Sequence, residues 1–222
     1  MGRILAFVRS RTSAQEENLA RARCAPAVQR ATPRPVLLAA TSPQWIKLAV
    51  ERFDAVLVDH AHCEKKAAAH ALSMLAAFPN EPGLARAMAR LAREESGHLA
   101  QVLRLLEQRG LELGKDPGDP YAQALQKHVR APAQERLLDK LLISALIEDR
   151  SRERLELLAK HLSDPELKTF YQRLAEAEAG HGSLFVRFAK KAAPDAFEAR
   201  FAELRAIEAR LIETLPIRAA IH

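Results

Sequence analysis

The segment LAREESGHLAQVL, residues 91–103, places Glu95 and His98 three positions apart in the middle of an apolar helical face. Residues three apart lie on the same side of an α-helix, so both side chains point the same way. The segment LAEAEAGHGSLF, residues 174–185, repeats this Glu-x-x-His arrangement on a second apolar face. Two such segments predict two helices that face each other across a shared polar centre.

Two further helical segments each carry one glutamate in the middle of an apolar face. Glu64 precedes Glu95 by about 30 residues, and Glu148 precedes Glu178 by about the same separation. Each half of the chain thus has a lone glutamate followed by a Glu-x-x-His. This repeat predicts two helix hairpins related by a pseudo-twofold axis.

The rest of the chain also reads as helices. Ser42 and Pro43 form a helix-start signal, and Gly110 is a residue that favours a helix end. The expected helices cover residues 43–52, 53–77, 82–109, 133–162, 165–191 and 194–214, with a short one at 121–129 inside a crossover at 111–132.

Four long helices joined by a short, a long and a short connection are typical of one architecture. We therefore expect an all-α, ferritin-like four-helix bundle with one long crossover and additional short terminal helices. Aromatic residues make up only 5% of the chain, which favours helices over twisted sheets.

The charge is concentrated at the N-terminus. The net charge is +6, and residues 1–40 contain seven arginines against Glu16 and Glu17, which leaves the remainder nearly neutral. The basic character alone is therefore poor evidence for a nucleic-acid partner. We expect residues 1–40 to be a flexible basic extension, or the product of a start codon assigned too far upstream, and 41–222 to be the bundle domain.

No segment has the roughly 18 apolar residues that cross a bilayer. The two cysteines, Cys24 and Cys63, do not form a disulfide framework or a C-x-x-C metal site. A cytoplasmic protein without a membrane partner is expected.

Four carboxylates that face one another inside a bundle repel strongly unless cations compensate them. Oxygen and imidazole ligands in this number suit a pair of iron or manganese ions, whose charge of +4 balances four glutamates. The expected ligands are Glu64, Glu95, His98, Glu148, Glu178 and His181. The alternative is a metal-free bundle in which the glutamates face solvent or pair with Arg86, Arg90, Arg93 and Arg152.

Residues beside the expected ligands have two interpretations each. His60 and Tyr171 either support the ligands from behind or are ordinary core residues. Glu94 and Glu176 lie off the inward face and are expected in solvent. His62 and His70 are also expected at the surface.

Four strings carry a more specific pattern: VDHAHCEKKAA (58–68), ESGH (95–98), IEDRSRER (147–154) and YQRLAEAEAGH (171–181). They resemble the bacterial tRNA 2-methylthio-N6-isopentenyladenosine hydroxylases, which are ferritin-like di-iron monooxygenases. The resemblance extends over about residues 41–215. It implies the same six ligands, with Glu95 and Glu178 also able to bridge two iron ions.

The resemblance also implies a function. We expect an O2-dependent enzyme that hydroxylates the isopentenyl side chain of this tRNA nucleoside next to the anticodon, with an external reductase as electron donor. No catalytic side chain is expected beyond the metal centre. An apolar pocket wall is expected from Leu91, Leu141, Leu174 and Phe185, and phosphate contacts are expected from Lys65, Lys66, Arg86, Arg90, Arg150, Arg187, Lys190 and Lys191.

Two features leave room for other outcomes. Gly180 and Gly182 flank His181, and each lowers helix propensity by up to ~1 kcal/mol, which predicts a loosened helix near the metal. A ferritin-like ferroxidase or iron-handling protein uses similar ligands without an organic substrate, and is the alternative function.

Overall fold

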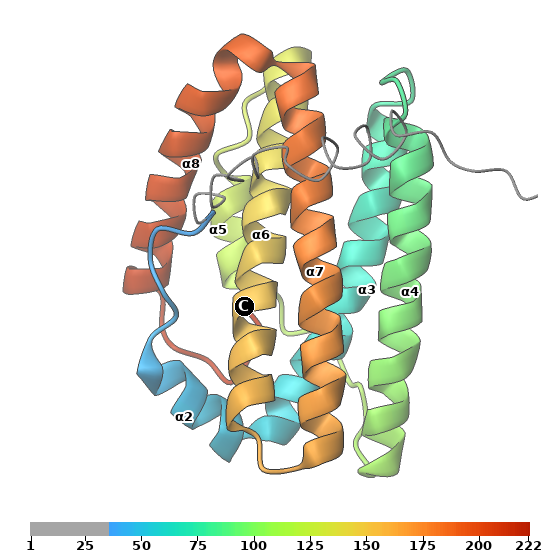
Figure 1. The fold of residues 1–222 in the computed structure, drawn as a ribbon, viewed down its shortest axis with the longest axis vertical. Coiled ribbons are helices and arrows are strands. Elements are labelled where there is room, and N and C mark those ends of the chain that lie inside the picture. The colour runs from blue at the N-terminus through green and yellow to red at the C-terminus, as the bar shows by residue number, and fades with distance from the viewer. Residues whose placement is uncertain (1–35) are drawn as a thin grey trace, which may run out of the picture. The chain divides into compact units, whose positions relative to one another are not determined.

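The computed structural model describes residues 36–222, which contain seven helices and no strand. The helices are α2 (Pro43–Glu51), α3 (Phe53–Ala77), α4 (Leu84–Gln108), α5 (Pro120–Gln126), α6 (Ala133–His161), α7 (Pro165–Ala192) and α8 (Pro194–Thr214). Figure 1 shows the four long helices α3, α4, α6 and α7 running along the same axis, with α8 outside α6. The predicted four-helix bundle with one long crossover is confirmed.

The helix ends follow the signals in the sequence. The Asp119 side chain accepts a hydrogen bond from the Ala122 backbone at the start of α5, and the Asp164 side chain accepts hydrogen bonds from two backbone amides at the start of α7. Gly83 precedes α4 with a φ of 82°, so this helix begins two residues later than expected. The helix α5 is shorter than predicted.

The bundle consists of two hairpins. α3 packs along α4, and α6 packs along α7, whereas the two hairpins approach each other closely only between α4 and α7. α2 contacts α3 and α6, and α8 covers α6 and α7 from outside. Side chains therefore fill most of the space between the hairpins.

Two apolar clusters occupy that space, one toward each end of the bundle. One contains Met88, Leu141 and Phe185, and the other contains Val102 and Leu174. On α4 and α7 the glutamates and histidines of the Glu-x-x-His segments lie between the residues of the two clusters. The polar centre is thus a layer between two apolar layers, each of which stabilises the fold by burying side chains.

A second polar network holds α6 against the outer elements. The Arg150 guanidinium is 0% exposed and donates to Glu208 on α8, to Glu153, and to the hydroxyl of Thr41. It also donates to the Ala39 carbonyl at 2.8 Å. Arg150 was expected to contact RNA phosphate; that expectation is wrong, because the side chain is buried and its donors are used inside the protein.

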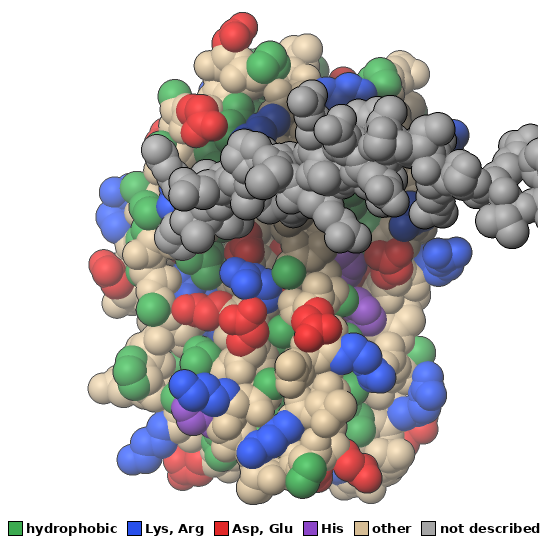
Figure 2. Space-filling view, in the orientation of Figure 1, with side chains coloured by type: hydrophobic (Ala, Val, Ile, Leu, Met, Phe, Trp, Pro, Cys, Tyr) green, Lys and Arg blue, Asp and Glu red, His purple; other side chains and the backbone are tan. Residues whose placement is uncertain are grey.

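Most of the expected N-terminal extension, residues 1–35, lies outside the described residues. Figure 2 shows acidic and basic side chains interspersed over the visible face, outside the grey atoms. Among residues 36–222, no helix combines the length and the apolar character that spanning a bilayer requires.

Candidate metal centre

The structure brings all six expected ligands together in the middle of the bundle. Two groups of residues each have ligand atoms within 4.8 Å of one another. The first group is Glu64, Glu95, His98 and Glu178, and the second is Glu95, Glu148, Glu178 and His181. Glu95 and Glu178 belong to both groups, so each carboxylate is placed to reach two adjacent positions.

The helices position these side chains away from solvent. Glu95 is 1% exposed, and the other three glutamates and His181 are also buried. His98 is the most accessible, with a side chain that is 13% exposed. The alternative, in which these glutamates face solvent or pair with arginines, is wrong. The glutamates are buried, and their ionic partners among the described residues are histidines.

His98 Nδ1 has the geometry of a metal ligand. It lies 3.6 Å from Glu64 Oε2, 3.5 Å from Glu95 Oε2 and 3.9 Å from Glu178 Oε1, and it is buried without a hydrogen bond. Two ligand atoms that share one ion at about 2.0–2.2 Å lie roughly 3–4 Å apart. The spacing therefore fits a shared cation better than direct hydrogen bonds.

His181 lies between two sets of carboxylates. Its Nδ1 is 2.9 Å from Glu95 Oε1 and 3.2 Å from Glu178 Oε2, while its Nε2 is 3.4 Å from Glu94 Oε2. Glu94 was expected in solvent, but one of its oxygens faces the far side of this imidazole. The helical spacing gave no signal for this contact, since Glu94 lies off the inward face of its helix.

The charges of the metal-free centre show how strongly it attracts cations. Burial lowers the pKa of His98, but the nearby carboxylates of Glu64 and Glu95 outweigh it and raise the pKa to about 10. For His181, burial is likewise outweighed by Glu178 and Glu95, and its pKa is raised to about 11. At neutral pH both imidazoles would carry a proton whenever no metal ion is bound to them.

The glutamates respond in opposite directions. Burial opposes the ionisation of Glu64, but the hydrogen bond with His60 and the nearby imidazole of His98 lower its pKa to about 2. Burial and repulsion from Glu178 raise the pKa of Glu148 well above its usual value. An oxygen- and nitrogen-rich site that holds protons as substitute cations fits a pair of divalent ions, and we conclude that this is a metal centre.

The two supporting residues that the sequence indicated lie in contact with the centre. His60 Nε2 is 2.7 Å from Glu64 Oε1, and the Tyr171 hydroxyl is 3.4 Å from His60 Nδ1. Both are buried, and their ring centroids are 5.5 Å apart. They hold the Glu64 carboxylate from behind, as partners of metal ligands commonly do.

A cavity of about 460 Å3 reaches the centre between α3, α5 and α6. Glu64, Glu95, Glu148 and Glu178 contribute to its wall at one end. Its apolar lining comes from small and branched side chains: Ala67, Ala69, Ala122, Ile147, Leu155 and Ile221. The expected lining by Leu91, Leu141, Leu174 and Phe185 is wrong, because these side chains belong to the two apolar clusters above and below the centre.

The remaining expected RNA contacts are accessible to different degrees. Lys65 has a 44% exposed side chain and Lys66 a 34% exposed one. The others are exposed: Arg86, Arg90, Arg187, Lys190 and Lys191. Lys191 Nζ donates to the Pro82 carbonyl at 3.3 Å, which brings the cations of α7 near the start of α4.

A family model described as tRNA-(MS[2]IO[6]A)-hydroxylase (MiaE) matches residues 29–222. The tRNA 2-(methylsulfanyl)-N(6)-isopentenyladenosine(37) hydroxylase of Pseudomonas putida is 41% identical over 175 residues, which cover 78% of this chain and 85% of the relative. The protein of the same name from Salmonella typhimurium is 35% identical over 125 residues, 56% of this chain and 46% of the relative.

A solved structure shares the fold. It is described as Protein 43 with aldehyde deformylating oxygenase activity from Synechococcus, and it matches with a TM-score of 0.80 and 37% identity. The match covers 84% of this chain and 94% of that structure. Because the family model extends through the whole bundle and the Pseudomonas putida relative is aligned over most of its length, the chain belongs to the tRNA-(MS[2]IO[6]A)-hydroxylase (MiaE) family.

Proposed function

We propose that this protein is an O2-dependent di-iron monooxygenase that hydroxylates the isopentenyl side chain of 2-methylthio-N6-isopentenyladenosine in tRNA. One observation carries the proposal: a cavity of about 460 Å3, with a largely apolar surface, is lined in part by four buried carboxylates. A volume of this size lies within the usual range for a small-molecule site. Membership of the hydroxylase family supports the same substrate.

The six clustered side chains are the proposed iron ligands. Glu64 and His98 belong to one position and Glu148 and His181 to the other, and the glutamates common to both groups join them. When bound there, two iron ions supply the activation of dioxygen that a C–H hydroxylation needs. The protein holds the ligands in place: His60 fixes one oxygen of Glu64, and the two apolar clusters enclose the layer.

The cavity walls suit a prenyl group. Ile147 and Leu155 of α6 and Ala67 of α3 offer apolar surface but no hydrogen-bonding side chain. An isopentenyl chain placed between them displaces water from the space beside the carboxylates. A base in an RNA loop is not in a duplex, so it can leave its stack and enter such a pocket at modest cost.

The reaction consumes two electrons beyond those of the C–H bond, and we propose an external reductase as their source. We also propose a cytoplasmic location, because the proposed substrate is a tRNA. Exposed Arg86, Arg90, Arg187 and Lys190 are the proposed contacts to the tRNA backbone, through charge rather than sequence.

The proposal is tested by nucleoside analysis of tRNA from cells with and without the gene. We expect the hydroxylated prenyl-adenosine to disappear in the deletion strain and to return with the wild-type gene. A Glu95→Ala gene should not restore it, whereas the surface control Glu176→Ala should. Identical nucleoside profiles with and without the gene would contradict the proposal.

Two assays on the purified protein separate the alternatives. Rapid iron oxidation without hydroxylated RNA would indicate the ferroxidase. Because the similar Synechococcus structure is named for aldehyde deformylating oxygenase activity, an aldehyde is the second substrate to offer. Turnover of the aldehyde without turnover of modified tRNA would also contradict the hydroxylase.

A further inference from the structure

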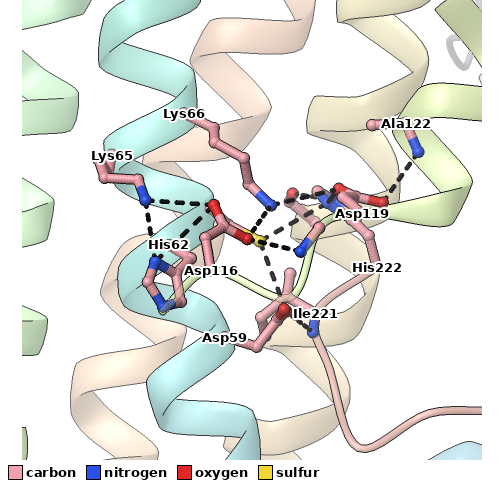
Figure 3. A network of polar contacts seen from close by, with 12 residues as sticks. Asp59, His62, Lys65, Lys66, Asp116, Asp119, Ala122, Ile221 and His222 are labelled. Atoms are coloured by element: carbon pink, nitrogen blue, oxygen red, sulfur yellow. Dashed lines mark hydrogen bonds and ion pairs between the residues drawn. The ribbon is translucent and has the colours of Figure 1, made fainter. Parts of the chain in front are cut away.

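Besides the four glutamates, the cavity has a polar end that is built from three distant parts of the chain. Figure 3 shows Lys66 of α3, Asp119 at the start of α5, and His222 drawn together, with Asp116 beside them. Lys66, Asp119 and His222 all line the cavity. Nothing in the helical periodicity indicates this convergence, because it depends on how the crossover and the last residues lie on α3.

Most polar atoms at this end already have partners. Asp119 accepts from the Ala122 backbone at 2.9 Å and lies 3.1 Å from His222 Nδ1, while His222 Nε2 is 2.8 Å from the Ser151 hydroxyl. The His222 ring also stacks on Tyr121, with centroids 5.3 Å apart. Asp119 and His222 therefore form a fixed wall.

Cys63, Asp119 and His222 also bring three ligand atoms within 4.8 Å. We do not interpret this cluster as a second metal site. Both ring nitrogens of His222 already contact hydrogen-bond partners, and the Lys66 ammonium lies 4.0 Å from Asp119 Oδ2. The cluster already contains its own cation, and a divalent ion beside it would be repelled.

The Lys66 ammonium differs from the other groups at this end. It is buried and makes no hydrogen bond, although Asp116 Oδ1 at 3.7 Å and Asp119 Oδ2 at 4.0 Å hold it by charge. An ammonium group has three hydrogen-bond donors and no acceptor. Buried donors are normally satisfied, so unused donors on a side chain that lines a substrate cavity indicate a ligand acceptor.

We propose that Lys66 positions the substrate by donating a hydrogen bond to an acceptor atom of the modified adenine. This inference rests on the proposed function. An adenine presents ring nitrogens as acceptors, and the prenyl group on its exocyclic nitrogen is short. The base must therefore enter the cavity for its prenyl group to reach the carboxylates, which places the ring within the same enclosure as Lys66.

Lys65 provides a matched control. It is the neighbouring residue and carries the same charge, but its ammonium donates to Asp116 at 3.1 Å and lies 3.0 Å from His62 Nδ1, and it does not line the cavity. Its side chain is also more exposed than that of Lys66. Loss of charge at the two positions is comparable, whereas only Lys66 faces the proposed base.

The test measures the affinity of an anticodon stem-loop RNA that carries the modified base, at several salt concentrations, for the wild type, Lys66→Met and Lys65→Met. We expect Lys66→Met to weaken binding about tenfold to hundredfold at every salt concentration, as for a lost hydrogen bond to a charged donor. Lys65→Met should weaken binding less than Lys66→Met, and any loss there should come with a reduced salt slope, as for a lost phosphate contact. Lys66→Arg, which keeps donors at this position, should recover part of the affinity.

The salt dependence separates the base from the RNA backbone. A lost phosphate contact reduces the slope of log affinity against log salt by about 0.7 to 1, whereas a lost base contact leaves the slope unchanged. A reduced slope, or unchanged affinity in Lys66→Met with unchanged melting temperature, would overturn the inference. If the wild type neither binds nor hydroxylates the modified RNA, it is the proposed function that fails.

Discussion

At the scale of single residues, Glu94 has a role that its partial exposure conceals. Its carboxylate faces Nε2 of His181, while Nδ1 of the same ring faces the metal centre. A carboxylate on the far side of a ligating imidazole fixes the ring orientation and increases its basicity. We therefore expect Glu94→Gln to weaken metal binding about 10- to 100-fold.

The measurement is an anaerobic Fe(II) titration of the metal-free protein. Glu176→Gln is the control, because Glu176 is an exposed glutamate on α7 that points away from the centre. The idea fails if both variants bind iron as the wild type does.

The protonated histidines predict a pH dependence of metal binding. Carboxylate neighbours hold His98 and His181 in the charged form, with pKa values of about 10 and 11, yet a metal ion requires neutral nitrogen. Loading at neutral pH should therefore release two or more protons, so that affinity increases with pH up to the folded-state pKa values. Calorimetry in buffers of different ionisation enthalpy counts these protons.

A variant supplies the check. His98→Ala removes one of the two protonated ligands and should release about one proton fewer. Equal proton release in both proteins, or metal affinity that does not change between pH 6 and 8, would contradict this account.

The six clustered residues were predictable because each belongs to a local pattern. Glu95 and His98 share a helical face, and the apolar residues around them fix which way that face points. Glu94 and the Lys66–Asp119–His222 cluster were not predictable, because their contacts join residues whose separation follows no period. Arg150 was placed at the surface by its charge, since helical spacing does not show that α8 covers the outer side of α6.

At the scale of elements, α7 continues without a break through Gly180 and Gly182, contrary to the loosened helix that these glycines predict. The packing differs between them. A Cβ at Gly180 meets no atom within 4 Å, whereas one at Gly182 lies 3.3 Å from Asp149 Oδ2. Because the buried Gly182 has no side chain, Asp149 can pack closely against the backbone of α7.

These positions form a matched pair for mutation. Gly180→Ala should raise the free energy of unfolding by roughly 0.5–1 kcal/mol, because alanine loses less backbone entropy in a helix. Gly182→Ala should stabilise the protein less than Gly180→Ala does, or destabilise it, because Asp149 must shift. Urea unfolding of the metal-free proteins measures both, and equal stabilisation would show that the Asp149 contact has no cost.

Two histidines that the sequence placed at the surface are covered by other parts of the chain. His62 is buried because residues 111–119 cover that side of α3, where His62 Nε2 lies 3.1 Å from the Leu113 carbonyl. His70 is half-buried, and its Nε2 lies 2.9 Å from the Ser144 hydroxyl of α6. Periodicity identifies the inward face of one helix, but it does not indicate what covers the other faces.

At the scale of the whole molecule, metal ions would join the two hairpins of the bundle in the middle of their interface. Glu64, Glu95 and His98 come from the α3–α4 hairpin, while Glu148, Glu178 and His181 come from the α6–α7 hairpin. The hairpins approach closely only between α4 and α7. Without ions, the buried carboxylates in this layer repel each other across the interface, and protons held by His98 and His181 offset only part of the charge.

Metal removal should therefore loosen the middle of the bundle before its ends. We expect hydrogen exchange to increase most in the turns around Glu64, Glu95, Glu148 and Glu178, because local opening there separates the repelling groups. The outer helix α8, which contributes no ligand, should change least. Glu148→Ala removes one of these carboxylates together with a ligand, so its exchange should respond less to added Fe(II) than that of the wild type. If added Fe(II) slowed hydrogen exchange in α8 as much as in the turns that carry the ligands, the ions would stabilise the protein only globally. They would then not act as the link between the hairpins.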